Sequence, residues 1–423
     1  MRKLTGLTLV ETRLAIIMLV PALLIVFAII VFPVLANFWI AFKPVSLGDL
    51  RPATPQVRER VVQEAEQAGD EVVVQYRVRN TSQQVPITDV TITATVPAGL
   101  QVARLPDSCS IEAGRITCTF DEWEGGYANA IDLRFTASEA WLSGDTATNR
   151  PTQPEASGTA PNVLTNLTFT LENFATVFTA RDFWPALWVT VVYTLFSTLG
   201  AIILGLFAAE LMNRSFTGRG LMRGLLLFPY VAPVIAVAFT WRFFLDPFSG
   251  TLNALLQEAG AIEQSIPFLS QRVYEFTPFG MPLRLPLALL SVIFFESWRY
   301  FPFAFLFILS RLQAIDDQLY ESADLDGASP FQQFWYITIP QLWTVLSTLF
   351  LLRFMWTFNK FDDVFLLTGG AAGTETLPIQ VYDNAFGRSD IGAGAATSVV
   401  LFFFLAVFLT IYFTTIAKEE SDA

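Results

Sequence analysis

Charged residues that interrupt two otherwise apolar stretches are the first candidates for chemistry in this sequence. Glu296 and Arg299 lie within an apolar run from residue 285 to 310, and Arg353 lies within a run from 342 to 367. Charged side chains within a membrane span are costly, typically face the bundle interior or a watery cavity, and often mark a substrate route. The same residues could instead form an ion-pair cluster that only locks two helices together.

These charges are predicted to lie at one depth. Glu296 and Arg299 are three residues apart and therefore share one helical face. At about 1.5 Å per residue, Arg299 and Arg353 both lie roughly 17 Å from the cytoplasmic ends of their helices. Because two arginines oppose one glutamate, the cluster predicts surplus positive charge, which favours a phosphorylated or acidic solute if it is a binding site.

Catalytic chemistry finds little support in the sequence. The chain has no histidine, no Cys/His spacing of the metal-binding type and no convincing nucleophile–base arrangement. It also lacks a G-x-x-x-x-G-K-[ST] phosphate-binding loop, so any ATP-derived energy must come from another polypeptide. We therefore predict no catalytic residues, no metal and no cofactor in this chain. A membrane-embedded enzyme and a receptor or adhesion protein are the disfavoured alternatives.

The elements that must position these residues are membrane helices. Of 423 residues, 53% are hydrophobic and 15% are charged, and crossing a hydrocarbon core of about 30 Å takes about 20 apolar residues. Six apolar runs are predicted to span the membrane: 14–42, 183–209, 224–241, 285–310, 342–367 and 391–417. The first run is too long for a signal-peptide core and is predicted to be a retained span.

Orientation is predicted from the positive-inside rule. Basic residues precede the first span and crowd the short loop between the second and third: Arg2, Lys3, Arg13, Arg214, Arg219 and Arg223. Six crossings then place both termini and the loop between the fourth and fifth spans in the cytoplasm, and residues 43–182 outside. The net charge of −12 argues against a nucleic-acid partner.

The external segment has the alternation of a β-structure. Apolar and polar residues alternate with period two in the stretches 74–78, 90–96, 116–120 and 131–135, as in half-buried strands. We predict a small β-sandwich with a core at about 70–140, flanked by linkers at 44–55 and 150–161. The stretches VPITDVTITATVPAGLQ and CSIEAGRITCTF resemble immunoglobulin-like repeat domains of bacterial surface proteins.

The only two cysteines, Cys109 and Cys118, stand symmetrically about the turn Ala113-Gly114. In an antiparallel pair they are directly opposed, about 4.5–5.5 Å apart, which is within disulfide range. We predict a disulfide bond, which fits an oxidising exterior. The alternative is two free thiols in a cytoplasmic loop.

A polar stretch, ESADLDGASPFQQFWYITIPQL at residues 321–342, separates two apolar runs. It predicts one short helix at 318–325 that ends at Gly327, because glycine readily adopts the positive φ of a helix C-cap. A second short helix is predicted to start at Ser329-Pro330. Its apolar side is formed by Phe331, Phe334 and Trp335.

This stretch carries the loop signature of binding-protein-dependent ABC importer permeases, E-A-A-x-x-D-G-A followed by F-x-x-I and a proline. The matching residues are Glu321, Ala323, Asp326, Gly327, Ala328, Phe334, Ile337 and Pro340. Further stretches resemble the carbohydrate branch of that family: LTLENFATVF, GRGLMRGLLLFPYVAPVIAVAFTWRFFLDP, GTLNALLQEAG and FDDVFLLTGGAAGTETLPIQVYDNAF. The external insert is similar in placement to that of the larger permease subunit of maltose-type transporters. The alternative for the loop is an amphipathic segment lying on the bilayer.

The resemblance implies an α-helical integral membrane protein of six transmembrane helices, with an extracytoplasmic immunoglobulin-like β-sandwich inserted between the first two. The expected divisions are residues 1–43, the insert 44–165, and a permease core 166–423 with a coupling loop at about 312–341. The location implied is a prokaryotic cytoplasmic (inner) membrane.

The implied function is that of a permease subunit for a sugar or oligosaccharide, working by alternating access. The implied partners are a second permease subunit, two subunits that hold ATP and Mg, and an extracytoplasmic solute-binding protein. Glu321 would face the ATPase, and Gly327 would set the angle between the two short helices. The insert either contacts the binding protein or is a passive fold.

In maltose-type permeases the stretches matching residues 296–303 and 357–360 contribute sugar contacts. This chain places charges at several of those positions, which puts maltose itself in doubt. The predicted solute-pathway residues are Glu296, Arg299, Tyr300, Arg353, Thr357 and Lys360. The solute's identity stays open.

Overall fold

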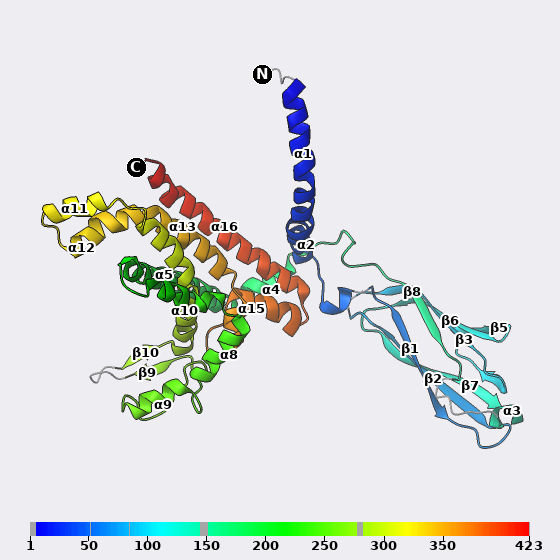
Figure 1. Cartoon of the computed structure of the whole chain (residues 1–423). Helices are drawn as coiled ribbons and strands as arrows, with labels where there is room; N and C mark the ends of the chain where they lie inside the picture. Colours follow the sequence, from blue (N-terminus) through cyan, green and yellow to red (C-terminus); the bar gives the residue numbers. More distant parts are fainter. Residues whose placement is uncertain (1–5, 51, 84, 144–150, 277–281, 423) are drawn as a thin grey trace. The chain divides into compact units, whose positions relative to one another are not determined.

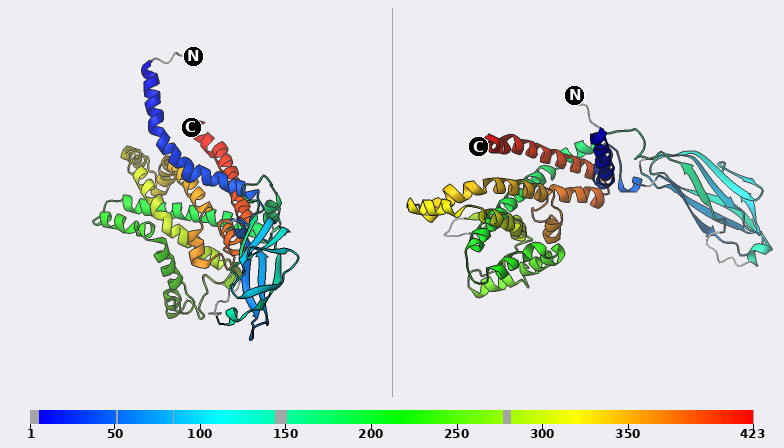
Figure 2. Two further views of the ribbon diagram at one scale, coloured as in Figure 1. Left: turned by 90° about the vertical axis from the view of Figure 1, so that its right-hand side faces the viewer. Right: turned by 45° about the horizontal axis from the view of Figure 1, so that its top comes forward.

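The computed structural model describes residues 6–50, 52–83, 85–143, 151–276 and 282–422. The chain divides into two compact units, shown in Figures 1 and 2. One unit comprises Met1–Asn173 and Ala385–Gly392, and the other comprises Phe174–Asn384 and Ala393–Ala423. Each unit has its own hydrophobic core.

The first unit begins with a long apolar helix built from α1 (Gly6–Val26), the π-helical turn η1 (Phe27–Val31) and α2 (Phe32–Ala41). Residues Thr12–Ala41 are long and apolar enough to cross a membrane, as the sequence predicts. Pro33 lies in the first turn of α2. Because proline lacks an N–H and its ring crowds the carbonyl four residues earlier, the preceding turn widens to the π form.

Within the described residues, eight strands follow in two antiparallel four-stranded sheets, with the orders β1-β2-β7-β4 and β5-β6-β3-β8. The strands are β1 (Pro55–Gln63), β2 (Glu71–Asn80), β3 (Ile87–Thr95), β4 (Leu100–Arg104), β5 (Cys109–Glu112), β6 (Arg115–Trp123), β7 (Ala128–Ala137) and β8 (Glu155–Thr159). Two short helices accompany them, η2 (Leu47–Leu50) and α3 (Glu139–Leu142).

The two sheets share one core. Tyr76 of β2 and Leu133 of β7 come from one sheet, whereas Ile92 of β3 and Ile116 of β6 come from the other, and all four are buried in the same apolar cluster. The alternation predicted from the sequence is therefore confirmed in β2, β3, β6 and β7. The finer resemblance to immunoglobulin-like domains stays a prediction.

The insert has more strands than its apolar pattern indicates. Strand β1 precedes the expected core at 70–140, and β8 lies within residues 150–161, where the prediction of a linker is wrong. The sequence of β8, EASGT, has no large apolar residue to mark it. Gly158 allows its close approach to β3, since a Cβ there would lie 2.6 Å from Ile87 Cγ2.

The cysteine prediction is confirmed. Strands β5 and β6 pair with Cys109 opposite Cys118, and the two cysteines form a disulfide. Ala113 and Gly114 turn the chain between them with φ of 50° and 76°. Positive φ at both central residues matches the right-handed twist of a two-residue hairpin.

The second unit is helical. Its elements are α4 (Glu172–Thr179), α5 (Phe183–Asn213), α6 (Arg219–Leu226), α7 (Phe228–Val231), α8 (Val234–Phe244), α9 (Thr251–Glu258), β9 (Tyr274–Phe276), β10 (Leu283–Leu285), α10 (Leu287–Leu312), α11 (Asp317–Leu325), α12 (Pro330–Gln333), η4 (Phe334–Thr338), α13 (Ile339–Phe358), α14 (Asp362–Thr368), α15 (Leu377–Tyr382), η5 (Asp383–Gly387) and α16 (Ile391–Asp422). Three of these elements extend into the other unit, which holds residues 172–173 of α4, residues 385–387 of η5 and the first two residues of α16.

Helices long and apolar enough to cross a membrane number five in the described chain, or six if one bent pair counts as a span. Besides the first, they are Phe183–Asn213, Leu287–Leu312, Pro330–Phe358 and Ile391–Thr415. The span predicted at 224–241 corresponds to the bent pair, in which Arg219–Val231 and Val234–Phe244 meet at 92°. Ala232 at the bend precedes Pro233 and is extended, with ψ of 142°, as steric clash with a following proline requires.

The fifth span also differs from its prediction. It begins at Pro330 rather than 342 and ends at Phe358 rather than 367. The expected second short helix is therefore the start of this span. Pro340 lies in the first turn of α13, and the π turn η4 before it lets the helix continue through the proline.

Helix α10 packs along α5 and is the central support of the helical unit (Figure 1). The contact is close because Gly205 of α5 has no side chain, and a Cβ there would lie 2.7 Å from the Cβ of Ala304. Small residues allow such close approach between membrane helices. The face of α10 that carries Glu296 is thereby held in place.

Candidate functional site

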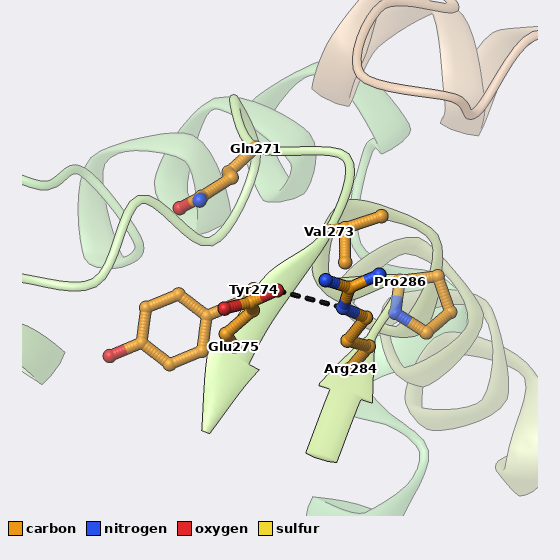
Figure 3. Close-up of a pocket in the computed structure, with 6 residues that line it drawn as sticks. All are labelled: Gln271, Val273, Tyr274, Glu275, Arg284 and Pro286. Atoms are coloured by element: carbon orange, nitrogen blue, oxygen red, sulfur yellow. Dashed lines mark hydrogen bonds and ion pairs between the residues drawn. The ribbon is translucent and has the colours of Figure 1, made fainter. Parts of the chain in front are cut away.

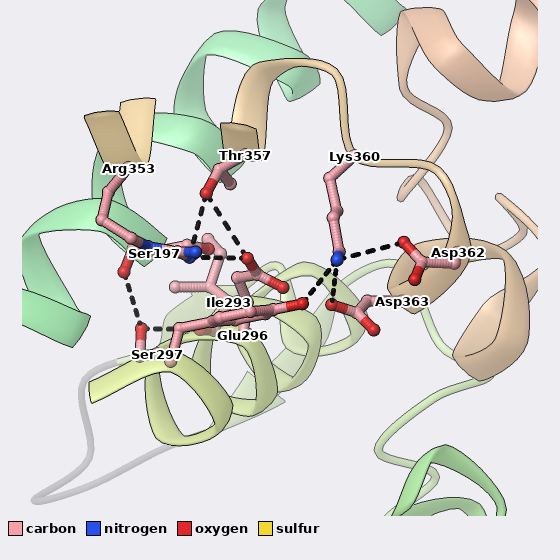
Figure 4. Close-up of polar contacts among 10 residues, drawn as sticks. Ser197, Ile293, Glu296, Ser297, Arg353, Thr357, Lys360, Asp362 and Asp363 are labelled. Carbon is pink, nitrogen blue, oxygen red and sulfur yellow. Dashed lines mark hydrogen bonds and ion pairs between the residues drawn. The ribbon is translucent and has the colours of Figure 1, made fainter. Parts of the chain in front are cut away.

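Glu296 and Arg353 form a buried ion pair between α10 and α13 (Figure 4). Arg353 Nη2 donates to Glu296 Oε1 at 2.8 Å and to Thr357 Oγ1 at 3.1 Å, and Thr357 Oγ1 donates to Glu296 Oε1 at 3.4 Å. The side chains are 2% exposed for Arg353 and 0% for Glu296. The predicted meeting of the charges of the fourth and fifth spans is therefore seen.

Lys360 forms a second, more open half of the cluster. Its Nζ lies 3.3 Å from Asp362 Oδ1 and 3.5 Å from Asp363 Oδ2, and it donates to the hydroxyl of Tyr300. Lys360 is 19% exposed and Asp362 is 45% exposed. A molecule approaching the cluster would meet these side chains before the sealed Glu296–Arg353 pair.

The Tyr300 ring joins the two halves. The Arg353 guanidinium lies 4.1 Å from its centroid and Lys360 Nζ lies 4.8 Å away. Cations over an aromatic face are attracted by its quadrupole, and more strongly where water is excluded. Tyr230 of α7 also meets the Tyr300 ring edge-on, with centroids 5.9 Å apart. Tyr300 is thus held from several sides.

Arg299 differs from the other predicted pathway residues. Its guanidinium is 5.5 Å from the centroid of Tyr300, but within the described chain it has no hydrogen-bond or ion-pair partner. It is 7% exposed. The structure brings together Glu296, Tyr300, Arg353, Thr357 and Lys360, and it places Arg299 beside them without a polar contact.

By formal charge, the cluster that the structure assembles has no surplus of positive charge, in contrast to the three residues counted from the sequence. Asp362 and Asp363 contribute two carboxylates that the prediction left out. The full set is balanced, with Arg299, Arg353 and Lys360 opposing Glu296, Asp362 and Asp363. The formal net charge of the cluster therefore does not favour an acidic solute.

Asp363 belongs to the cluster but was not among the residues predicted from the sequence. Its side chain is 0% exposed. Lys360 lies between α13 and α14, and Asp363 lies in the first turn of α14, so no spacing rule for one helix predicts that they pair. Ser297 was missed as well. It donates to Ser197 O of α5 at 3.3 Å and so fastens α10 next to Glu296 (Figure 4).

A second candidate region is the elbow, defined here as α11, α12 and η4 with the turn between α11 and α12. Asp316 caps α11 by accepting from Gln318 N at 3.0 Å. Gly327 has φ of 77°, which confirms the predicted left-handed residue after the first helix. Ser329 and Gln332 form a capping box at the start of α12, so each turn of the elbow has its own local stop or start signal.

Hydrogen bonds join the parts of the elbow to each other, and large apolar side chains lie on its exposed surface. The Gln333 side chain donates to Asp324 of α11, and Tyr320 and Thr338 hydroxyls lie 2.9 Å apart. Leu325, Phe331 and Tyr336 are nevertheless 90%, 72% and 80% exposed. Glu321, Asp326 and Gly327 are also exposed. Of the signature residues, Ala323 and Ala328 are half-buried in the elbow, Phe334 and Ile337 are half-buried in η4, and Pro340 is in α13.

The opposite end of α10 carries a short hairpin. Strands β9 and β10 precede the helix and α11 follows it, so the hairpin and the elbow are separated by a helix of 26 residues, or roughly 39 Å. Beside the hairpin is a hollow of about 670 Å³ lined by Gln271, Val273, Tyr274, Glu275, Arg284 and Pro286 (Figure 3). Arg284 Nε pairs with Glu275 Oε1 at 2.7 Å across the strands.

In the part of the chain that the structure describes, no three His, Cys, Asp or Glu side chains gather as they would around a metal. The polar groups instead form ion pairs and hydrogen bonds inside a helical membrane unit. Such an arrangement can bind and orient a small molecule, and it can change when the helices move.

The chain belongs to the family of binding-protein-dependent transport system inner membrane components, whose family model matches residues 201–418. It is therefore a component of a transport system with several membrane spans, and not an enzyme. The matched residues lie outside the β-sheet insert.

Relatives of known name are similar over the helical unit. The inner membrane ABC transporter permease protein YcjO of Escherichia coli K12 is 36% identical over 246 residues, which cover 58% of this chain and 78% of YcjO. The trehalose/maltose transport system permease protein MalF of Thermococcus litoralis is 33% identical over 243 residues, covering 57% of this chain and 77% of MalF. In a crystal structure of a bacterial ABC transporter involved in alginate import, one chain is 21% identical with a TM-score of 0.49, covering 59% of this chain and 83% of that one.

Proposed function

We propose that this chain is one transmembrane subunit of an ATP-driven ABC importer for a sugar or oligosaccharide, and that the elbow couples it to a separate ATPase. The observation that carries the proposal is the exposed apolar surface of the elbow, on a chain whose family is binding-protein-dependent transport components. The partners are a second permease subunit, two ATP-binding subunits and an extracytoplasmic solute-binding protein. Both termini face the cytoplasm of a prokaryotic inner membrane.

The elbow has the properties of a docking element. Leu325, Phe331 and Tyr336 leave large apolar side chains in solvent at one end of the helical unit, and clustered exposed apolar groups mark interaction sites. Its caps and internal hydrogen bonds make it rigid, so little conformational entropy is lost when a partner binds. A groove on an ATPase subunit is the expected partner, with Glu321 facing it.

One continuous helix also connects the elbow to the charged cluster. The helix from Pro330 to Phe358 begins in the elbow and carries Arg353 and Thr357. Arg353 lies 23 residues beyond Pro330, or roughly 35 Å along the helix axis. A displacement of α12 by an ATPase would therefore be transmitted along this helix and would move Arg353 relative to Glu296. Alternating access requires such a movement.

A sugar is the favoured solute for two reasons. The relative MalF is named for trehalose and maltose transport. The open half of the cluster combines an aromatic ring, Tyr300, with the hydrogen-bonding groups of Lys360 and Asp362, and its charges are balanced. A phosphorylated, acidic or non-sugar solute remains the alternative, supported only by the partnerless guanidinium of Arg299.

Purification from the native membrane tests the coupling. The tagged full-length chain is extracted in a mild detergent, and the ATPase activity that co-elutes with it is measured. We expect an ATP-hydrolysing subunit with the wild type and loss of most of that activity with Phe331→Glu, because a carboxylate would be buried in the apolar contact. Phe216→Glu, in the connection between α5 and α6, is the matched control and should retain it.

Two results would contradict the proposal. One is a wild-type chain that elutes without any ATP-hydrolysing subunit. The other is an equal loss with Phe331→Glu and Phe216→Glu, which would mean that the elbow has no special part in docking.

A further inference from the structure

The outer face of the sheet β1-β2-β7-β4 carries a group of arginines outside the proposed transport site. Side chains alternate along each strand, and Tyr76 and Val78 of β2 point into the core. Arg77 and Arg79 therefore point outward, together with Gln56 and Arg58 of β1. We name Arg58, Arg77 and Arg79 the arginine face.

Strand register places these residues in two adjacent rows. Arg79 is opposite Gln56 on one side and Ala128 on the other. Arg77 is opposite Arg58 on one side and Ala130 on the other. The side chains of the two alanines are short and leave space beside the long arginine side chains. The result is a hollow of about 440 Å³ lined by Gln56, Arg58, Arg77, Val78, Arg79, Ala128, Asn129 and Ala130.

The guanidinium groups are oriented by amides and not neutralised by carboxylates. Arg79 donates from Nε and Nη2 to Gln56 Oε1 at 2.9 and 2.7 Å. Arg77 Nε donates to Gln75 Oε1 at 3.4 Å. An amide oxygen fixes the direction of a guanidinium but leaves its charge intact, so the remaining N–H groups stay available to an anion.

Among the residues that the structure describes, the carboxylates of the same face contact other side chains and not the three arginines. Asp132 accepts from Gln75 Nε2 at 2.9 Å, and Glu71 pairs with Arg134 at 3.1 Å. Arg58 has no hydrogen-bond or ion-pair partner within the described residues. Arg58 and Arg77 are also directly opposed across β1 and β2, an arrangement of like charges that destabilises a sheet. This occurs in a chain with a net charge of −12.

We propose that the arginine face is a binding site for an anionic saccharide, one that bears carboxylates on successive sugar units. Planar guanidinium groups bind carboxylates with two parallel hydrogen bonds, and the side-chain NH2 group of Gln56 offers a further donor for hydroxyls. The hollow has the volume of a small-molecule site, for which about 300–1,000 Å³ is typical. Of the residue types that are enriched at protein interfaces, its lining includes arginine but no aromatic or Met side chain.

The test measures binding to the full-length chain in nanodiscs of uncharged lipid, at a fixed salt concentration. The probe is fluorescently labelled tetragalacturonate, with maltotetraose as its neutral counterpart. We expect the wild type to bind tetragalacturonate and not maltotetraose. Arg58→Gln with Arg77→Gln should weaken binding about tenfold or more, because two charge-assisted contacts are lost.

The matched control is Arg104→Gln with Arg115→Gln, which changes the net charge of the insert by the same amount at two other exposed arginines. It should leave the affinity within about twofold, since long-range charge is screened by salt. Equal weakening in the two double variants would overturn the site, because only overall charge would then matter. Absence of binding to the wild type would also overturn it.

Two further probes separate the sources of anionic groups. Tripolyphosphate offers phosphate without sugar, and a tetraglutamate peptide offers carboxylates on a polypeptide. We expect both to bind at least tenfold more weakly than tetragalacturonate. Equal or tighter binding of tetraglutamate would assign the face to an acidic protein partner, and equal or tighter binding of tripolyphosphate would assign it to phosphate groups. Either result would overturn the saccharide assignment.

Discussion

Arginines occupy opposite environments in the two units. In the helical unit, Arg353 is 2% exposed and its charge is matched by Glu296, which is 0% exposed. In the insert, Arg58 and Arg77 are exposed and stand opposite each other without a carboxylate. Leaving a buried charge alone costs several kcal/mol, whereas an exposed charge is solvated by water. Burial therefore dictates the partners of Arg353, while exposure leaves the arginine face available to a ligand.

The charged cluster of the helical unit itself contains both buried and partly exposed charges. The Glu296–Arg353 pair is sealed, but Lys360 and Asp362 are partly exposed and joined to it through Tyr300. The sealed half fits the interpretation of a lock between α10 and α13. The open half fits the interpretation of a solute contact. The two hypotheses raised by the sequence thus apply to different residues of one cluster.

The largest expected effect comes from breaking the sealed pair. Glu296→Gln leaves the Arg353 guanidinium buried without a counter-charge, and we expect it to lower the free energy of unfolding by about 3–5 kcal/mol. The measurement is denaturant or thermal unfolding of the purified chain in detergent. Glu296→Met with Arg353→Met removes both charges and should recover most of that loss. A single variant as stable as the wild type would show that burial does not impose the pairing.

A buried polar group in the insert extends the comparison. Tyr76 is fully buried, its hydroxyl bonds to Thr152, and burial raises its pKa above the ordinary value, with the Thr152 hydrogen bond opposing and Glu59 adding to the rise. An unfolded tyrosine titrates near pH 10. The stabilisation that depends on the neutral hydroxyl is therefore fully present below about pH 10 and is lost as pH rises above it.

The insert should accordingly unfold more easily in alkali, and Tyr76→Phe should reduce that sensitivity. The measurement is unfolding followed by tryptophan fluorescence from pH 8 to about 11.5. Tyr127→Phe, at a half-buried position of the same insert, is the matched control and should keep the alkaline loss. If both variants lose the pH dependence to the same degree, Tyr76 is not its source.

The smallest expected effects are at the exposed arginines. Arg134→Gln removes an ion pair in which both side chains are partly exposed, and it should lower stability by about 0.2–1 kcal/mol. Arg77→Gln removes one of two opposed like charges and should raise stability by no more than about 0.5 kcal/mol. Unfolding at low and high salt checks both, since screening should diminish each difference. A loss of several kcal/mol with Arg77→Gln would mean that this arginine has a structural role.

The sequence predicted features whose causes are local. The long apolar runs at residues 14–42, 183–209 and 391–417 became membrane-length helices, because a bilayer selects for length and apolarity alone. The left-handed Gly327 and the hairpin between Cys109 and Cys118 follow from turn chemistry confined to a few residues. The family signature in the elbow belongs to the same class of short, contiguous signals.

Other features were decided only by contacts between distant segments. Strand β8 has no apolar alternation and exists because its small residues fit beside β3. Asp363 belongs to the charged cluster because the chain turns back after Phe358, which no spacing rule for a single helix indicates. The hollow at the arginine face needs three strands in register, with residues from positions 56 to 130. Composition and periodicity therefore determined which helices are long and apolar enough to cross a membrane and where the alternating strands lie. Tertiary packing decided which charges meet, because pairing depends on distances that local sequence does not encode.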